Sequence, residues 1–206
     1  MTEIGIIIGL VISAYLLGSI PFGYLIAKKK GIPDIRETGS GSTGGTNVSR
    51  KLGIKWGIVV ALFDALKCAL PVFLARKIFN IDLTVSLIMI ISAVLGHIYP
   101  IWLKFRAGKG VASAIGGLLV IIPPIGLLFP LGIWLSLLVS TGYVSLANLS
   151  LLLSLAIVLG FAYQSLLFFL LGILLVIIIT WAHRENIAGI IKGTERKFDL
   201  PKFKRP

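Results

Sequence analysis

Long runs of apolar residues, separated by short basic segments, make up most of this chain. Between Val111 and Ala182 the sequence contains no Asp, Glu, Lys or Arg. A run of that length is too apolar for a soluble core, whereas about 20 apolar residues are enough for one membrane-spanning helix. The pattern therefore predicts several membrane spans. The polar tetrapeptide His183-Arg184-Glu185-Asn186 follows the last of them.

The interruptions between apolar runs predict seven helices. Pro123-Pro124 and the polar or glycine-containing segments 140–143 and 160–164 divide the long apolar block, because proline removes a backbone donor and disfavours helix in the residue before it. The expected spans are 4–27, 56–75, 83–103, 111–122, 125–139, 143–159 and 165–182. The fourth would be about 18 Å long, too short to cross alone, so we expect a half-helix inside the bundle. The sequence thus predicts an all-α integral membrane protein, with about seven transmembrane helices, some short or broken, in a single domain over residues 1–206.

The net charge of +12 is concentrated in three segments. The polar loop Lys28–Lys55, the compact loop Lys104–Gly110 and the tail Arg184–Pro206 hold all but three of the 20 Lys and Arg residues. The positive-inside rule places these segments in the cytoplasm, with the N-terminus outside and the C-terminus inside. Basic residues beside anionic headgroups account for this charge, so we expect the lipid bilayer and no nucleic acid as a partner. The N-terminal residues carry Glu3 and lack a basic leader, which predicts a first span and not a cleaved signal peptide.

The first candidate motif runs from Arg36 to Arg50 and is rich in glycine and hydroxyl side chains. Three of its glycines have the G-x-G-x-x-G spacing, but without a preceding strand the dinucleotide-binding interpretation is poor. Glycine lets backbone N–H groups approach an anion, hydroxyls add donors, and the two arginines add charge. A flexible Gly/Ser linker is the plainer alternative. The flanking arginines and Asn47 favour an anion site.

The second candidate motif combines Gly96–Pro100 with Lys104–Gly110, just before an apolar helix. A Walker A loop is excluded because Leu103 and Gly110 occupy positions that need Gly and Ser or Thr. Glycines around Lys109 at a helix start still favour phosphate binding, because free N–H groups and a positive helix end converge there. An ordinary basic turn beside the membrane is the alternative.

Two further polar groups lie at or within the spans. His183 and Asn186 form the third motif, for which capping of a cytoplasmic helix end is the alternative. Asp64 and Lys67 lie inside the second span on one helix face, so we expect them to pair or face the bundle interior in a structural role. The sequence has no carboxylate cluster or Cys/His spacing for a metal, and we expect neither a metal nor another cofactor.

In this order, the three motifs resemble the acyl-phosphate-dependent glycerol-3-phosphate acyltransferases of bacteria, the PlsY family. The likeness covers Gly18–Gly23, Ser40–Arg50, Asp64 with Lys67, Gly96–Ser113 and His183–Ile187. It implies a seven-helix fold in the bacterial inner membrane, with a cytoplasmic site that takes acyl phosphate and glycerol 3-phosphate. The implied reaction moves a fatty acyl group to the 1-hydroxyl of glycerol 3-phosphate and releases lysophosphatidic acid and phosphate. It also implies a functional link to the enzyme that forms acyl phosphate.

The resemblance further implies roles for individual residues. Catalytic roles fall to Ser40, His183 and Asn186. Substrate contacts fall to Arg50, Thr46 and Asn47 in the first motif, and to Lys104, Gly108, Lys109 and Gly110 in the second. The general base is open between His183 and a substrate phosphate. Departures from the family pattern are Ser42, Gly45, Cys68 and Ala107. A transporter or channel for a small phosphorylated anion is the alternative function, although the chain shows no internal repeat and its motifs group on one side of the membrane.

Overall fold

The computed structural model describes residues 3–198, in which the regular secondary structure is helical. In chain order the elements, of which the η elements are 3-10 helices, are α1 (Glu3–Gly18), α2 (Phe22–Lys29), η1 (Ile35–Glu37), α3 (Gly45–Leu52), α4 (Ile54–Phe79), α5 (Leu83–Ile98), η2 (Ile101–Leu103), α6 (Val111–Leu118), η3 (Pro124–Leu127), α7 (Leu128–Thr141), α8 (Val144–Ala162), α9 (Leu166–Ala182) and α10 (Arg184–Ile191). They form two compact units, the first ending at Ile121 and the second beginning at Ile122. That residues 1–206 act as one domain stays a prediction.

Helices of spanning length occur where the apolar runs predicted them. Five segments within residues 3–198 are long and apolar enough to cross a membrane: Glu3–Lys29, Ile54–Phe79, Leu83–Leu103, Pro124–Thr141 and Val144–Ala162. A sixth exists if α9 and α10, bent by 65° at their junction, count as one span. Helix α6, with eight residues, is too short to cross alone, as expected of a half-helix. All seven predicted helices are therefore present in the predicted order.

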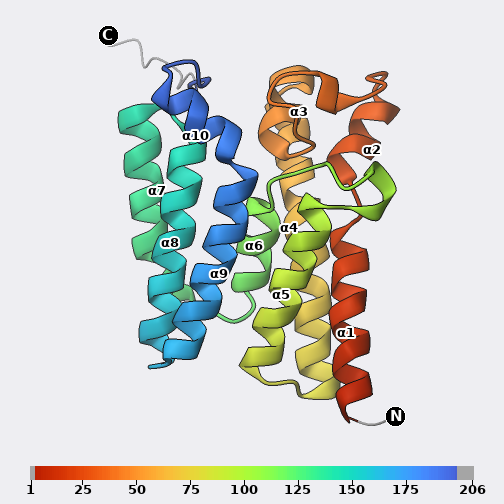
Figure 1. Ribbon diagram of the computed structural model, residues 1–206, viewed down its shortest axis with the longest axis vertical. Helices are drawn as coiled ribbons and strands as arrows, with labels where there is room; N and C mark the ends of the chain where they lie inside the picture. Colours follow the sequence, from red (N-terminus) through yellow and green to blue (C-terminus); the bar gives the residue numbers. More distant parts are fainter. Residues whose placement is uncertain (1–2, 199–206) are drawn as a thin grey trace. The chain divides into compact units, whose positions relative to one another are not determined.

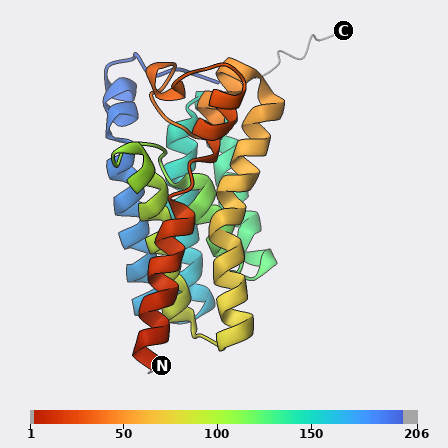
Figure 2. The ribbon, with the colours of Figure 1, turned by 90° about the vertical axis from the view of Figure 1, so that its right-hand side faces the viewer.

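Close helix contacts hold the first unit together, in which α1, α4 and α5 run beside one another (Figures 1 and 2). A Cβ added to Gly18 would lie 2.2 Å from the carbonyl oxygen of Ala93, and one added to Gly96 would lie 2.2 Å from that of Tyr15. Small residues at such crossings let backbones approach within a membrane bundle. Helix α6 packs against both α4 and α5, and buried Cys68 of α4 lies against Gly117 of α6. These contacts fix the end of α5 and the position of α6 against α4.

The segment Lys28–Lys55 is not the plain polar loop that its composition predicted. The first span is broken at 19–21 and continues as α2, and the segment that follows contains η1 and α3. Helix α3 forms because it has an apolar side: Val48 is buried with Ala27, Ile35 and Val60. In Figure 1 these elements lie at the end of the first unit that is remote from the N-terminus.

The second unit consists of α7, α8 and α9 side by side, with α10 following α9 (Figure 1). The indole Nε1 of Trp134 donates to Asn148 Oδ1 at 2.9 Å and joins α7 to α8. Gly172 permits close packing of α9 on α8, because a Cβ there would lie 2.8 Å from Cβ of Ala156. The backbone N–H of Phe198 donates to the carbonyl of Gly142 at 2.8 Å, which ties the chain after α10 to the end of α7.

Candidate active site

One buried amide organises the glycine-rich segment 34–44, hereafter the first loop. The Nδ2 of Asn47 donates to the carbonyl oxygens of Ile35, Thr38 and Ser42 at 3.1, 3.0 and 2.8 Å. Its Oδ1 accepts the backbone N–H of Ser40 at 2.9 Å, and the side chain is only 1% exposed. These bonds give the loop one defined path, which a flexible linker lacks. Asn47, predicted to contact substrate, has both polar atoms engaged with the loop.

The remaining predicted residues of the first motif lie on the accessible side of this loop and at the start of α3. Ser40 is half-buried, whereas Thr46 and Arg50 are exposed. Gly39 and Gly41 adopt φ of 61° and 65°, a left-handed conformation that glycine adopts without strain. The first N–H groups of α3 lack carbonyl partners within the helix, as at any helix start. The loop and the start of α3 thus supply donors, and Arg50 adds a cation in the last turn of this short helix.

The second loop, residues 103–110, is a tight turn between η2 and α6. Its residues Lys104 and Phe105 have φ of 54° and 58°, and Gly110 has φ of 84°. The N–H of Gly108 donates to the carbonyl of His97 at 3.3 Å. A Cβ at Gly108 would lie 1.7 Å from His97 Nε2, so only glycine fits against this imidazole. Lys109, half-buried, lies two residues before α6 and close in sequence to its N-terminal N–H groups.

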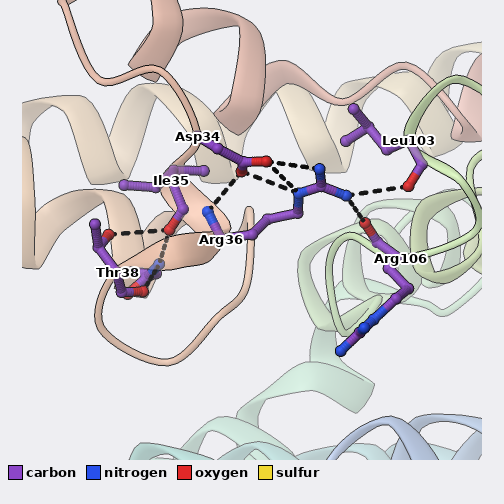
Figure 3. A network of polar contacts seen from close by, with 7 residues as sticks. Asp34, Ile35, Arg36, Thr38, Leu103 and Arg106 are labelled. Atoms are coloured by element: carbon purple, nitrogen blue, oxygen red, sulfur yellow. Dashed lines mark hydrogen bonds and ion pairs between the residues drawn. The ribbon is translucent and has the colours of Figure 1, made fainter.

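Hydrogen bonds join the two loops (Figure 3). The backbone N–H of Thr43 donates to the carbonyl of Ala107 at 3.3 Å. The guanidinium of Arg36 is bonded to Asp34 and to two carbonyls of the second loop. Arg36, predicted to add charge to an anion site, therefore has a different set of partners in the structure. Its hydrogen bonds hold the pKa of the Asp34 carboxyl below the usual 3.8.

Beneath the second loop lies a buried group of three ionisable side chains. Lys67 Nζ lies 2.9 Å from Asp64 Oδ1, and their side chains are 3% and 2% exposed. Their pairing is thus confirmed. His97 Nδ1 lies 3.5 Å from the same oxygen, and Lys67 also donates to the carbonyl of Ile20 at 2.8 Å. Sequence reasoning did not assign His97, because its contacts come from helices distant in the chain. Through these contacts the group links α4, the break between α1 and α2, and His97, which lies against Gly108.

In the second unit, the tetrapeptide separates into buried and exposed members. His183 is 2% exposed, and its Nδ1 lies 2.8 Å from the carbonyl oxygen of Ile179. Asn186 Nδ2 donates to Glu195 Oε1 at 2.7 Å, and Glu195 is a partner that sequence reasoning missed. Arg184 is exposed and donates to the carbonyl of Trp181 at 3.0 Å, as expected of a residue at the end of a span.

The structure brings both sets of predicted substrate contacts, with Ser40, to one end of the first unit. Their roles towards a substrate, like those of His183 and Asn186 in the second unit, stay predictions. Apolar helices of spanning length, with two joined glycine-bearing loops at one end of the first unit, define a class: multi-pass membrane proteins. A family model described as glycerol-3-phosphate acyltransferase matches residues 8–193. The chain belongs to this glycerol-3-phosphate acyltransferase family.

Individual relatives and solved structures agree with this assignment. The chain is 42% identical over 189 residues to the glycerol-3-phosphate acyltransferase of Aquifex aeolicus, covering 92% of this chain and 97% of that protein. It is 43% identical over 186 residues to that of Thermosipho melanesiensis, covering 90% of each. It resembles crystal structures of the integral membrane glycerol 3-phosphate acyltransferase PlsY. The glycerol 3-phosphate form has a TM-score of 0.87 at 41% identity, covering 94% of this chain and 96% of that one. The lysophosphatidic acid form has a TM-score of 0.84 at 40% identity, covering 94% and 95%. The predicted class, an all-α integral membrane protein, is confirmed.

Proposed function

We propose that the protein transfers a fatty acyl group from acyl phosphate to the 1-hydroxyl of glycerol 3-phosphate, giving lysophosphatidic acid and inorganic phosphate. Family membership supports the acceptor, since the relatives are glycerol-3-phosphate acyltransferases. One observation supports a site for two phosphorylated substrates: the joined pair of loops, each with glycines and a helix N-terminus beside it, with the cation Lys109 in the second loop. The names of the relatives do not specify the acyl donor, and the choice of acyl phosphate is our proposal.

The chemistry of acyl phosphate suits such a site. Its carbonyl belongs to a mixed anhydride, so the donor is already activated. The glycerol oxygen attacks this carbonyl carbon, the bond to the phosphate oxygen breaks, and phosphate leaves with that electron pair. The hydroxyl proton passes to a base, which is either His183 or a substrate phosphate. The enzyme needs to place the two substrates and stabilise anionic oxygens, for which donors and cations are sufficient.

Each predicted residue then has a task. We assign phosphate binding to Arg50, an exposed cation in the last turn of α3, and to Lys109, which lies two residues before α6. Ser40 donates a hydrogen bond from the first loop. Asn47 acts through the shape of that loop, because its amide is bonded to loop backbone. The contribution of Asn186 is measured by the kcat of its Ala variant, for which we expect a loss of about 10²-fold.

The donor is tested with purified protein, glycerol 3-phosphate and either palmitoyl phosphate or palmitoyl-CoA. We expect equal amounts of phosphate and lysophosphatidic acid from palmitoyl phosphate, no product from palmitoyl-CoA, and no inhibition by a chelator. Equal turnover with palmitoyl-CoA would show the donor assignment to be wrong. Uptake of glycerol 3-phosphate into protein-containing liposomes, without lysophosphatidic acid, would instead support the transporter alternative.

We also propose that both loops face the cytoplasm, with the N-terminus outside, because the basic residues concentrate there. Single cysteines at Arg106 and Asn80, in a Cys68→Ala background, report the two ends of the first unit. An impermeant thiol reagent added to intact cells should label position 80 only, and position 106 should react once cells are opened. Labelling of position 106 in intact cells would show that the protein has the opposite orientation to the one proposed.

A further inference from the structure

We infer that Arg36 and Asp34 form a positioning clasp, which sets the second loop against the first and so shapes the binding site for glycerol 3-phosphate. This inference rests on the proposed function of the two loops and adds a residue pair to which that function assigns no role. The clasp acts through backbone carbonyls, and neither side chain is needed to touch a substrate. Figure 3 shows its arrangement.

The first half of the clasp fixes the plane of the guanidinium. Arg36 Nε lies 3.0 and 3.1 Å from the two carboxylate oxygens of Asp34, and its second terminal nitrogen, Nη2, lies 2.6 Å from Oδ2. The same carboxylate accepts the backbone N–H of Arg36 at 2.9 Å, which caps η1. A planar fork on a carboxylate has a defined orientation as well as a strong attraction. Asp34 therefore aims the remaining terminal nitrogen, Nη1, away from the first loop.

The second half of the clasp reaches the second loop. Nη1 of Arg36 donates to the carbonyl oxygen of Leu103 at 3.0 Å and to that of Arg106 at 2.9 Å. These carbonyls flank Lys104 and Phe105, two consecutive non-glycine residues with left-handed φ. Such a conformation is unfavourable for side chains with a Cβ, and it persists where surrounding contacts hold it. The guanidinium is the group in Figure 3 that holds both ends of this turn.

The position of the turn matters because Gly108 and Lys109 follow it directly. A turn released from Arg36 keeps its bond from Thr43 to Ala107 and its contact with His97, so we expect the protein to fold. What changes is the placement of the following N–H groups and ammonium. A phosphate contact that is weakened equally in the ground and transition states raises KM more than it lowers kcat. A lysine cannot replace the clasp, because a single ammonium cannot present the planar fork.

The test compares Arg36→Gln with Arg106→Ala. Both variants remove one positive charge near the turn, but the Arg106 side chain points away from the network in Figure 3 and only its carbonyl takes part. We expect Arg36→Gln to raise the KM for glycerol 3-phosphate by about tenfold or more, with a smaller change in kcat and in the KM for acyl phosphate. Arg106→Ala should change these constants by less than about threefold, because the Arg106 side chain is exposed and salt screens its charge. Equal effects of the two variants would overturn the clasp in favour of loop charge alone.

Two further variants test the mechanism of the clasp. Arg36→Lys keeps the charge and should not restore the KM, and full restoration by lysine would refute the inference. Asp34→Asn combined with Arg36→Gln should be no worse than Arg36→Gln alone, because the pair acts as one unit. Additive losses would mean that the two residues act separately.

A structural measurement separates the clasp from the proposed function. Hydrogen exchange of peptides covering residues 103–110 should accelerate in Arg36→Gln and Arg36→Lys, and stay as in the wild type in Arg106→Ala. Unchanged exchange in all three would overturn the clasp even if a KM changed. A wild-type protein without acyl phosphate activity would instead refute the proposed function and leave the exchange result standing.

Discussion

The buried pair of Asp64 and Lys67 allows the sharpest test of how this membrane fold is stabilised. Lys67→Met removes the ammonium but preserves most of the side-chain volume. Asp64 would then remain 2% exposed, with His97 at 3.5 Å as its remaining ionisable neighbour. The carbonyl of Ile20 would lose its Lys67 donor as well. The variant thus leaves a carboxylate in a site that water does not reach.

The expected magnitude follows from burial. Breaking a buried ion pair by removing one partner costs about 3–5 kcal/mol, because the other charge is left uncompensated. A chain of this size loses about 2–4 °C in Tm for each kcal/mol. The Tm of Lys67→Met should therefore fall by roughly 6–20 °C. It is measured by tryptophan fluorescence during thermal unfolding in one detergent at one concentration.

Two control variants test whether the loss in Tm comes from the uncompensated charge. Asp64→Asn combined with Lys67→Met removes both charges, so most of the lost Tm should return. Lys77→Met changes an exposed lysine of the same helix and should shift the Tm by about 2 °C or less. A double variant as unstable as Lys67→Met would refute the reasoning from uncompensated charge. A Tm for Lys67→Met equal to that of Lys77→Met would show that the pair contributes nothing.

Three further predictions concern the loops and the tetrapeptide. Gly108→Ala should raise the KM for glycerol 3-phosphate by about tenfold or more, because the added Cβ would lie 1.7 Å from His97 Nε2 and displace the turn; an unchanged KM would contradict this. His183→Ala should lower kcat by about 10²-fold or more and Arg184→Ala by much less, because only the histidine is buried; steady-state kinetics of correctly inserted protein would expose equal losses. Because Arg36 lowers the pKa of folded Asp34, its contribution to stability is present above its unfolded value of 3.8 and is lost as pH falls through the folded pKa. The Tm difference between wild type and Asp34→Asn should therefore be constant from neutral pH to about pH 5 and shrink in stronger acid. A Tm difference that grows in acid would show that the pKa of Asp34 is raised, not lowered, in the folded state.

The spans could be predicted from the sequence because a chain inside lipid has few possible backbone conformations. An apolar run of spanning length can satisfy its backbone in a bilayer only as a helix, so the breaks at proline and glycine located the helix ends to within a few residues. The pairing of Asp64 with Lys67 was predictable for a similar reason, since spacing puts them on one face and neither charge is tolerated alone. Both predictions depend on local pattern and solvent.

The loops could not be predicted in the same way. The amide of Asn47 bonds to carbonyls up to 12 residues away, and Arg36 reaches carbonyls 67 and 70 residues away. Such contacts depend on the path of the folded backbone, which composition does not reveal. For this reason Arg36 and Asn47 were interpreted as anion ligands, whereas the structure shows their polar atoms bonded to loop atoms. The contact between Gly108 and His97 was missed for the same reason.

The single thiol of Cys68 can report how often the helices of the first unit separate. It is the only cysteine of the chain and is fully buried in α4 against Gly117 of α6. A thiol reagent can reach it only when these two helices separate, so the labelling rate of the unmodified protein measures how often the first unit opens. The second unit, without cysteine, contributes no signal. If glycerol 3-phosphate binds the first unit as proposed, it should lower the open fraction and slow labelling by the same factor, so that the labelling rate reports substrate binding without turnover.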